Sequence, residues 1–348
     1  MKRIIFYTCL FTVFTVAAFS QTDLQTVATV NLTGKTESIT VRQLRLEIEK
    51  FEKAAGRSLD RDERRKVLDT MIDERLALQA AERDKIVVFD NEVNSQINQL
   101  REQMAQAIGR PPTDTEFWAA VRSETGLEQA AYREHMKRQL TIQKFLMTKK
   151  EDTFKNIRVP TEREITDWYD LNRTRFVRPD TVRFSMIQVP YGENATSKTR
   201  AKELVDRLAR EIGTSPARFD EVVLRGQAPN SGYQAGDGGY LPRNQEAAQV
   251  VGQEFIGIAF NLKQGEVSKV IEGRLGYQII KVTETYSMKS LELDDIFQLG
   301  TRATVRDFVG NGILQERQME TLQKASEELV AELRAGRSFR VIEQNLNW

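Results

Sequence analysis

Histidine and cysteine are the residue types that this chain has least of. Its 348 residues include one histidine, one cysteine, three tryptophans and eight prolines. Histidine is the commonest metal ligand and a frequent general base, so a single histidine excludes most metal centres and most catalytic triads. The one cysteine, Cys9, lies among the first twenty residues, which leaves the rest of the chain without a disulfide or a cysteine-based metal site. We therefore expect no metal and no cofactor.

An excess of charge of either sign is also missing. The chain has 51 Lys and Arg residues against 50 Asp and Glu residues, a formal net charge of +1. It has no basic arm and no stripe in which basic and aromatic residues alternate, so nucleic acid is not expected as a partner. The length indicates two or more domains, since single domains commonly have roughly 100–200 residues.

The first twenty residues predict a secretory signal peptide. A positively charged end at residues 1–3 precedes an apolar run over residues 4–19, and Ala18 and Ser20 are small residues placed three and one positions before a cut. The run is shorter than the roughly 20 apolar residues that a spanning helix prefers. An uncleaved membrane anchor is the alternative. Cys9 lacks the small residues and the longer apolar run that precede the cysteine of a lipoprotein signal, which disfavours that signal.

Residues 26–149 predict a short strand followed by amphipathic helices. The alternating residues 26–34 suit a strand and turn. Asp60 and Glu63 form a capping-box pair ahead of a helix whose apolar residues recur at helical spacing. Further helices are expected at residues 41–51, from residue 90, and around residues 116–121 and 127–149. A generic helical domain, whose apolar stripes form only its own core, is the alternative interpretation.

The second half of the chain predicts a small domain of strands and helices. Thr161 and Glu164 form another capping box before a helix at residues 165–172. A strand at residues 182–189 follows, and its alternation places Met186 and Gln188 on one face. The next elements are a helix at residues 196–212, a short helix near residues 219–224, a glycine-dense loop at residues 235–240, a helix containing Phe255 and Phe260, and two closing strands around a glycine-bounded turn. This order suits an α+β domain with a four-stranded antiparallel sheet.

Several motifs in this half, in one order, resemble the parvulin (PpiC-type) peptidyl-prolyl isomerase domain. They are the AGDGGY loop at residues 235–240, the two phenylalanines of the following helix, the LKQGEVS turn at residues 262–268 and the GYQIIKV strand at residues 276–282. The first half resembles the N-terminal module of the SurA/PrsA/PpiD-type foldases in the stretches VNLTGKTESITVRQL, VLDTMIDERLALQAAERDKIVV and YREHMKRQLTIQKFL. The ending ELRAGRSFRVIEQ resembles the segment that returns to complete that module.

The resemblance implies a multi-domain protein with a mainly α-helical SurA-N-like chaperone module and a small α+β parvulin-like domain. The expected boundaries are a signal peptide at residues 1–20, the helical module at residues 21–158, a connecting helix and turn at residues 159–180, the parvulin-like domain at residues 181–287, and a C-terminal helix and strand at residues 288–348. The last segment is expected to return to the N-terminal module, and residues 339–348 are expected to form its strand.

Isomerisation of a prolyl bond sets simple requirements for a site. No covalent bond breaks, and the obstacle is a rotation barrier of roughly 18–20 kcal/mol about the amide. A catalyst needs an apolar slot for the proline ring and polar groups that favour the twisted amide. In the parvulin pattern a Met or Leu and phenylalanines form the slot. The resemblance places these pocket residues at Val251, Phe255 and Phe260.

The polar part of the parvulin pattern is two histidines and a Cys or Asp, and here it is replaced. The resemblance places the two histidine positions at Met186 and Gln278 and the Cys or Asp position at Ala228. Gln278 is either a pocket residue, together with Met186, or a glutamine satisfied by the backbone. Asp237 in the glycine-dense loop is expected to form a turn rather than to act as an acid. His135 is expected to be a solvated residue of a charged helix, and a lone catalytic base is the alternative.

Three classes of function follow from these expectations. The first is a periplasmic chaperone that binds unfolded or proline-containing exported polypeptides, chiefly outer-membrane proteins, with weak or absent isomerase activity. The second is an active parvulin-type isomerase with an altered polar set. The third is a membrane-anchored scaffold, which requires that residues 1–20 stay uncleaved and is the only one of the three that places the chain on a membrane.

Overall fold

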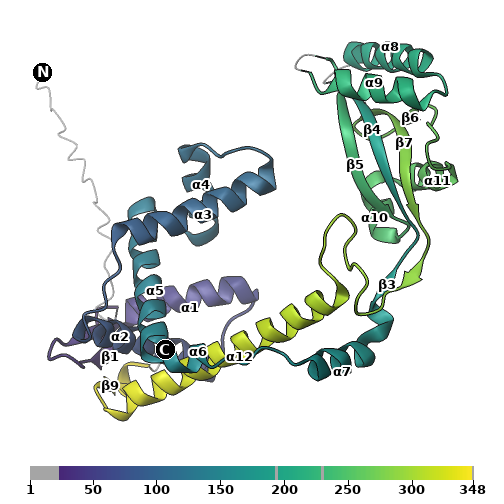
Figure 1. Cartoon of the computed structure of the whole chain (residues 1–348). Helices are drawn as coiled ribbons and strands as arrows, with labels where there is room; N and C mark the ends of the chain where they lie inside the picture. Colours follow the sequence, from purple (N-terminus) through teal and green to yellow (C-terminus); the bar gives the residue numbers. More distant parts are fainter. Residues whose placement is uncertain (1–22, 193–194, 229–230, 347–348) are drawn as a thin grey trace, which may run out of the picture. The chain divides into compact units, whose positions relative to one another are not determined.

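The computed structural model describes residues 23–192, 195–228 and 231–346, so the predicted signal peptide lies outside the described residues. The chain divides into two compact units (Figure 1). The first unit holds the residues up to Ile157 and those from Arg317 onward, and the second holds Arg158–Glu316. Within the described ranges, no helix combines the length and the apolar character needed to cross a membrane.

The first unit combines a small sheet with helices. Its antiparallel strands, in the order β2-β1-β9, are β1 (Thr26–Val30), β2 (Glu37–Thr40) and β9 (Phe339–Val341). Its helices are α1 (Val41–Ala55), α2 (Arg61–Arg83), α3 (Asp90–Ile108), α4 (Asp114–Thr125), α5 (Gln129–Lys149), α6 (Glu151–Lys155) and the later part of α12 (Val305–Ala335). The predicted strand over residues 339–348 is shorter than expected, because the chain turns after β9 into the 3₁₀ helix η2 (Glu343–Leu346).

The core of the first unit joins the two ends of the chain. Leu68, Ile72 and Leu76 of α2 pack in one buried cluster with Phe145 of α5 and Leu329 of α12. Strand β9 pairs with β1 in the same unit. Helix α12 therefore carries apolar residues that this unit buries, and the chain from Arg317 onward belongs to the first unit.

One buried polar side chain holds the β1–β2 connection on this core. Gln79 of α2 is 1% exposed. Its Oε1 accepts from the backbone N–H of Leu32 at 2.8 Å, and its Nε2 donates to the carbonyl of Lys35 at 3.3 Å and to Glu37 Oε1 at 3.1 Å. Buried polar groups are costly unless they are hydrogen-bonded, so Gln79 and this turn depend on each other.

Gln79→Leu is expected to destabilise the first unit by about 1–3 kcal/mol, because it removes the hydrogen bonds from Gln79 to the β1–β2 turn and leaves the partly buried Leu32 N–H without its partner. Hydrogen–deuterium exchange under native conditions, read at the amides of β1 and β2, measures this loss separately from the second unit. Gln139→Leu on the exposed side of α5 is the matched control. Equal protection in both variants would show that the turn does not depend on the glutamine.

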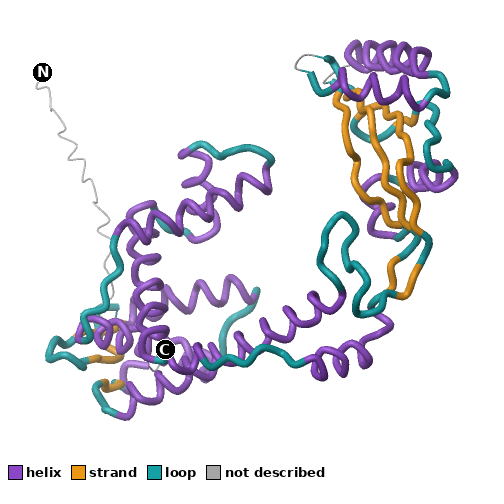
Figure 2. The backbone as a smooth tube through the Cα atoms, viewed as in Figure 1, coloured by secondary structure: helices purple, strands orange, loops and turns teal. Residues whose placement is uncertain are grey.

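The second unit is built on a four-stranded antiparallel sheet in the order β5-β4-β7-β6, whose strands are orange in Figure 2. The strands are β4 (Thr181–Pro190), β5 (Gln234–Pro242), β6 (Ile271–Glu272) and β7 (Gly276–Tyr286). Its helices are α7 (Glu162–Asn172), α8 (Ala195–Ile212), α9 (Pro216–Gly226), α10 (Gln245–Val251) and α11 (Gln253–Asn261), and the short strands β3 (Val177–Arg178) and β8 (Lys289–Ser290) pair beside them. The predicted α+β domain with a four-stranded antiparallel sheet is confirmed.

The two faces of this sheet carry separate cores. Ile187 of β4 and Ile279 of β7 pack with α8 and α9, whereas Phe184 of β4 and Ile280 of β7 pack with α11. The split follows from the strand period of two, which sends successive side chains to opposite faces. The alternation that the sequence predicted for residues 182–189 is therefore present, and Met186 lies on the α11 face.

The glycine-dense segment is not the loop that the sequence predicted but strand β5, which pairs with β4. Its register shifts by one residue where Phe184 faces Gly239 and Ser185 faces Asp237, so Gly238 is the extra residue of a bulge. Gly239 has φ +79°, which favours glycine, and a Cβ on Gly238 would meet the Phe184 ring at 2.3 Å. The glycines therefore serve a bulge and a close approach to an aromatic ring.

The second unit also includes more of the chain than the sequence predicted. Ile165 and Tyr169 of α7 share a buried cluster with Leu291, Val305 and Val309, and the Tyr169 hydroxyl donates to the carbonyl of Leu291 at 3.0 Å. This packing places the predicted connecting segment, residues 159–180, and residues 288–316 of the predicted return segment in the second unit. The boundary differs from the predicted one because α12 is a single continuous helix. The apolar residues of its first part are buried in the second unit, and those of its later part are buried in the first unit.

Candidate functional site

The α11 face of the sheet brings together most of the residues that the sequence predicted for a site. Met186 on β4 and Phe255, Phe260 and Val251 on α10 and α11 belong to one hydrophobic cluster. Gln278 on β7 pairs with Gln188 on the neighbouring strand β4. Gln188 lies two residues after Met186, on the same face of the sheet. Since paired residues share a face of an antiparallel sheet, Gln278 lies on the same face as this cluster.

Phe255 forms the base of this face rather than its surface. The residue is 4% exposed, and its ring packs edge-to-face on Phe184 with 5.5 Å between the ring centroids. The backbone at Gly238 also lies close to Phe184, because a Cβ there would meet the ring at 2.3 Å. Phe255 is therefore enclosed by the core, and a bound segment could reach it only if neighbouring side chains moved.

Phe260 and Val251 are half-buried and lie at the edge of the same cluster. The exposed Arg243 places its guanidinium carbon 5.4 Å from the centroid of the Phe260 ring, in a cation–π arrangement. Met186 is also half-buried. Of the predicted site residues in this cluster, these three are the ones accessible to a bound segment.

Ala228 lies apart from this group. It is an exposed residue of the turn that follows α9, and its backbone N–H donates to the carbonyl of Arg225 at 3.2 Å. Helix α9 packs on the opposite face of the sheet through Phe219 and Val222. The two residues after Ala228 lie outside the described residues, and the assignment of Ala228 to the site stays a prediction.

A group of ionised side chains surrounds Arg183 of β4. Asp237 accepts from the backbone N–H of Gly239 at 2.9 Å and from Arg183 Nη2 at 2.7 Å, and the hydrogen bond from Arg183 lowers the pKa of Asp237. Asp237 thus shapes the bulge as a charged carboxylate, in agreement with its interpretation as a turn former. Glu284 also binds Arg183 at 2.9 Å, and its hydrogen bond from the Tyr286 hydroxyl raises the pKa of Tyr286 to about 12.

Groups suited to metal binding are scarce. In the described part of the chain, no three His, Cys, Asp or Glu side chains gather where they could hold a metal ion. His135 lies on α5 in the first unit, half-buried rather than fully solvated. The α11 face therefore has no imidazole, and the one thiol of the chain, on Cys9, lies outside the described residues.

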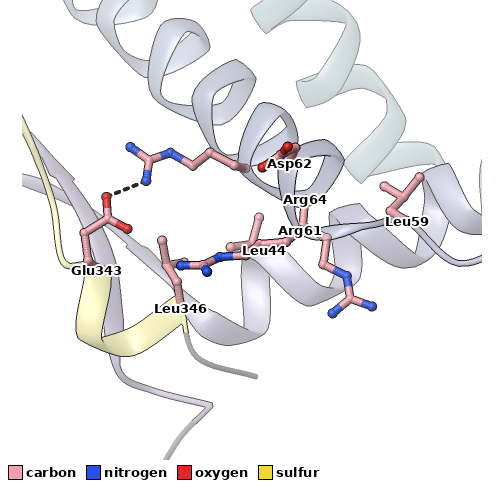
Figure 3. Close-up of a pocket in the computed structure, with 8 residues that line it drawn as sticks. Leu44, Leu59, Arg61, Asp62, Arg64, Glu343 and Leu346 are labelled. Carbon is pink, nitrogen blue, oxygen red and sulfur yellow. Dashed lines mark hydrogen bonds and ion pairs between the residues drawn. The ribbon is translucent and has the colours of Figure 1, made fainter.

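Two cavities lie away from the predicted site residues. One, of about 680 Å³, lies in the first unit and is shown in Figure 3, where Leu44, Leu59 and Leu346 adjoin Arg61 and Arg64. Beside them, Arg65 and Glu343 form an ion pair at 2.5 Å. The other, of about 760 Å³, lies in the second unit between the end of α8 and the segment before β6, with Ile212 and Val267 in its lining.

Two further glutamines, outside the predicted site residues, also lie on the α11 face. Gln188 of β4 pairs with Gln278 of β7 on one side and with Gln234 of β5 on the other. The three side chains therefore stand in one row across three strands. The alternation of residues 182–189 already placed Gln188 on this face, but only the strand pairing reveals Gln234 as its neighbour.

Comparisons with known proteins agree with the two units. Residues 160–296 match the PPIC-type PPIase domain, and residues 1–146 match the SurA-like N-terminal domain. The foldase protein PrsA of Clostridium botulinum is 23% identical over 287 residues, which are 80% of this chain and 75% of that protein. The chaperone SurA of Alcanivorax borkumensis is 27% identical over 228 residues, 64% of this chain and 47% of that protein.

A solved structure, one of two structurally related SurA-like chaperones of Campylobacter jejuni, is 16% identical and has a TM-score of 0.40. The comparison covers 91% of this chain and 100% of that one.

Proposed function

We propose that this chain, which belongs to the SurA/PrsA-type foldase chaperones through its SurA-like N-terminal domain and its PPIC-type PPIase domain, binds unfolded, proline-containing segments of exported polypeptides with little or no isomerase turnover. Its proposed compartment is the periplasm, reached through a signal peptide at residues 1–20. Its proposed clients are outer-membrane proteins.

The proposal depends chiefly on the composition of the α11 face. The face keeps apolar residues that a client can reach, Met186, Val251 and Phe260. At two positions where the parvulin pattern has histidine, it has Met186 and Gln278, which do not ionise. An apolar slot can hold a proline ring through burial alone, whereas acceleration of the rotation needs polar groups aimed at the twisted amide. The arrangement therefore supports binding better than turnover.

The first test uses the chain that starts at Gln21 and an outer-membrane β-barrel protein diluted from urea. Light scattering should show that an equimolar amount of the chain suppresses aggregation of the client. A denatured cytosolic enzyme of similar size is the comparison, and equal suppression of both would remove the preference for outer-membrane clients. No suppression of either would contradict the chaperone function itself.

A matched pair of substitutions locates the binding face. Phe260→Ala is expected to weaken binding of a proline-containing peptide by about tenfold or more, because burying an aromatic side chain contributes about 1.5–3 kcal/mol. Leu224→Ala is the control, since Leu224 is 67% exposed on α9, which packs on the opposite face. Fluorescence anisotropy of a labelled peptide measures both. Equal losses in the two variants would place binding elsewhere.

An active isomerase with an altered polar set is the second candidate. The half-buried carboxamide of Gln278 favours it, because an amide on this face could hydrogen-bond to a twisted prolyl bond. In that case Gln278→Ala should abolish the isomerisation rate while peptide binding persists.

A further inference from the structure

Three glutamines in register form a polar row beside the apolar part of the α11 face. Gln234, Gln188 and Gln278 occupy paired positions on β5, β4 and β7, so their side chains leave the sheet on one side. Adjacent strands are about 4.7–4.9 Å apart, so two such steps span about 10 Å. This is the length of about three residues of an extended chain, each of which rises about 3.3 Å.

Within the described residues, the three carboxamides have no hydrogen-bond partner. Gln188 and Gln278 are half-buried and Gln234 is exposed. None of their side-chain oxygens or nitrogens forms a hydrogen bond with a described group. The oxygen of Gln278 lies over Gly273, 3.2 Å from the position that a Cβ on that glycine would take. The row thus presents donors and acceptors that the fold itself does not use.

The row has open space at Gly236, and the neighbouring row of paired residues is uncharged. The neighbouring row across the sheet consists of Gly236, Met186 and Ile280. A Cβ built on Gly236 meets no atom within 4 Å. Neither row contains an ionisable side chain. A ligand that lies here meets carboxamides on one side and the Met186 thioether on the other.

We propose that the glutamine row, Gln234–Gln188–Gln278, binds the main-chain amides of an uncharged polypeptide segment while Met186 and Phe260 contact its apolar side chains. This inference rests on the proposed function, because it names the chemistry by which that face recognises its client. A carboxamide both donates and accepts, and so matches a peptide group at every residue whatever the side chain. Recognition is therefore tolerant of sequence but disfavours segments whose charges would lose water without gaining a partner.

The decisive experiment pairs protein variants with a change in the peptide backbone. The chain starting at Gln21 is titrated with an uncharged proline-containing peptide and with its depsipeptide analogues, in which one backbone amide at a time becomes an ester. An ester lacks the N–H donor and has a weaker acceptor. At one or more positions, wild-type protein should bind the ester several-fold more weakly than the amide.

Substitution with methionine keeps the length of each glutamine and removes its hydrogen bonds. Gln188→Met with Gln278→Met should weaken binding of the amide peptide by about tenfold, the scale of one or two hydrogen bonds, and should abolish the preference for amide over ester. Gln234→Met, at an exposed position where folding is not at risk, should reduce that preference on its own. Gln264→Met in the exposed turn before β6 is the matched control.

The outcomes separate the two proposals. An ester penalty of the same size in wild-type protein and in the methionine variants overturns the glutamine row while leaving client binding intact. Wild-type protein that binds no peptide at all overturns the proposed function and, with it, this inference. Affinity that falls steeply with added salt would also overturn the row, because contacts between neutral amides are not screened.

Discussion

A prolyl peptide is expected to isomerise at least about a hundredfold more slowly on this chain than on a parvulin that has both histidines. Removing one preorganised polar group from an active site commonly costs about 10²–10³ in rate, and the proposed assignment puts Met186 and Gln278 at two histidine positions. No histidine of the second unit can replace them, because the single histidine of the chain, His135, lies in the first unit. The expected acceleration over the uncatalysed rotation is therefore small.

Exchange spectroscopy by NMR on a short prolyl peptide measures this rate without a coupled protease. Aggregation suppression by the same preparation establishes that the protein is folded and able to bind. Restoring histidine at positions 186 and 278, with Asp at position 228, is expected to raise the rate if Ala228 belongs to the site. Wild-type rates equal to those of ordinary parvulins, and lost on Gln278→Ala, would show that Gln278 has taken over the polar role.

The elements of this fold followed from local sequence signals, but their assembly did not. Capping boxes at Asp60 and Thr161 marked two helix starts correctly, because a cap depends only on residues three positions apart. The glycine-dense segment shows the limit of such signals. Its glycines are typical of a loop, yet the segment pairs with β4 around a bulge, and that pairing brings together residues about fifty positions apart.

The division of α12 between the two units has the same cause. Val309 and Leu329 belong to one continuous apolar pattern along the sequence, so nothing local distinguishes the core that buries each of them. The distinction depends on α7 and α2, which are more than a hundred residues away. A periodic pattern predicts that a helix has a buried face, but it does not identify the partner.

From the sequence, only the part of the candidate site that depends on alternation within one strand could be predicted. Alternation placed Met186 and Gln188 on one face, and the structure agrees. The row of glutamines could not be foreseen, because it depends on the register of β5 against β4, and a bulge at Gly238 shifts that register by one residue. The sequence likewise does not indicate that Phe255 is buried. Spacing along a helix does not show how deeply the neighbouring strands enclose a ring.

Phe255→Ala is expected to act first on stability, lowering the free energy of unfolding of the second unit by about 3–5 kcal/mol. This is the range for truncating a buried phenylalanine, since the cost of the cavity adds to the lost burial. Phe255 is 4% exposed and packs on Phe184, whose ring is itself in close contact with the backbone at Gly238, so the surrounding groups have little room to collapse into the space. The sequence alone had suggested a residue that lines the slot and contributes mainly to binding.

Comparison with Phe260→Ala separates these two roles, because Phe260 is half-buried at the edge of the same cluster. Hydrogen–deuterium exchange at the amides of β4 and β7 should show a large loss of protection for Phe255→Ala and a small one for Phe260→Ala. Peptide affinity, measured where both variants are folded, should fall more for Phe260→Ala, because that ring is the accessible one. If Phe255→Ala instead keeps its protection to within about 1 kcal/mol and loses affinity, its ring is exposed to clients by a movement of the face, and a slot lined by Phe255 would be the better description.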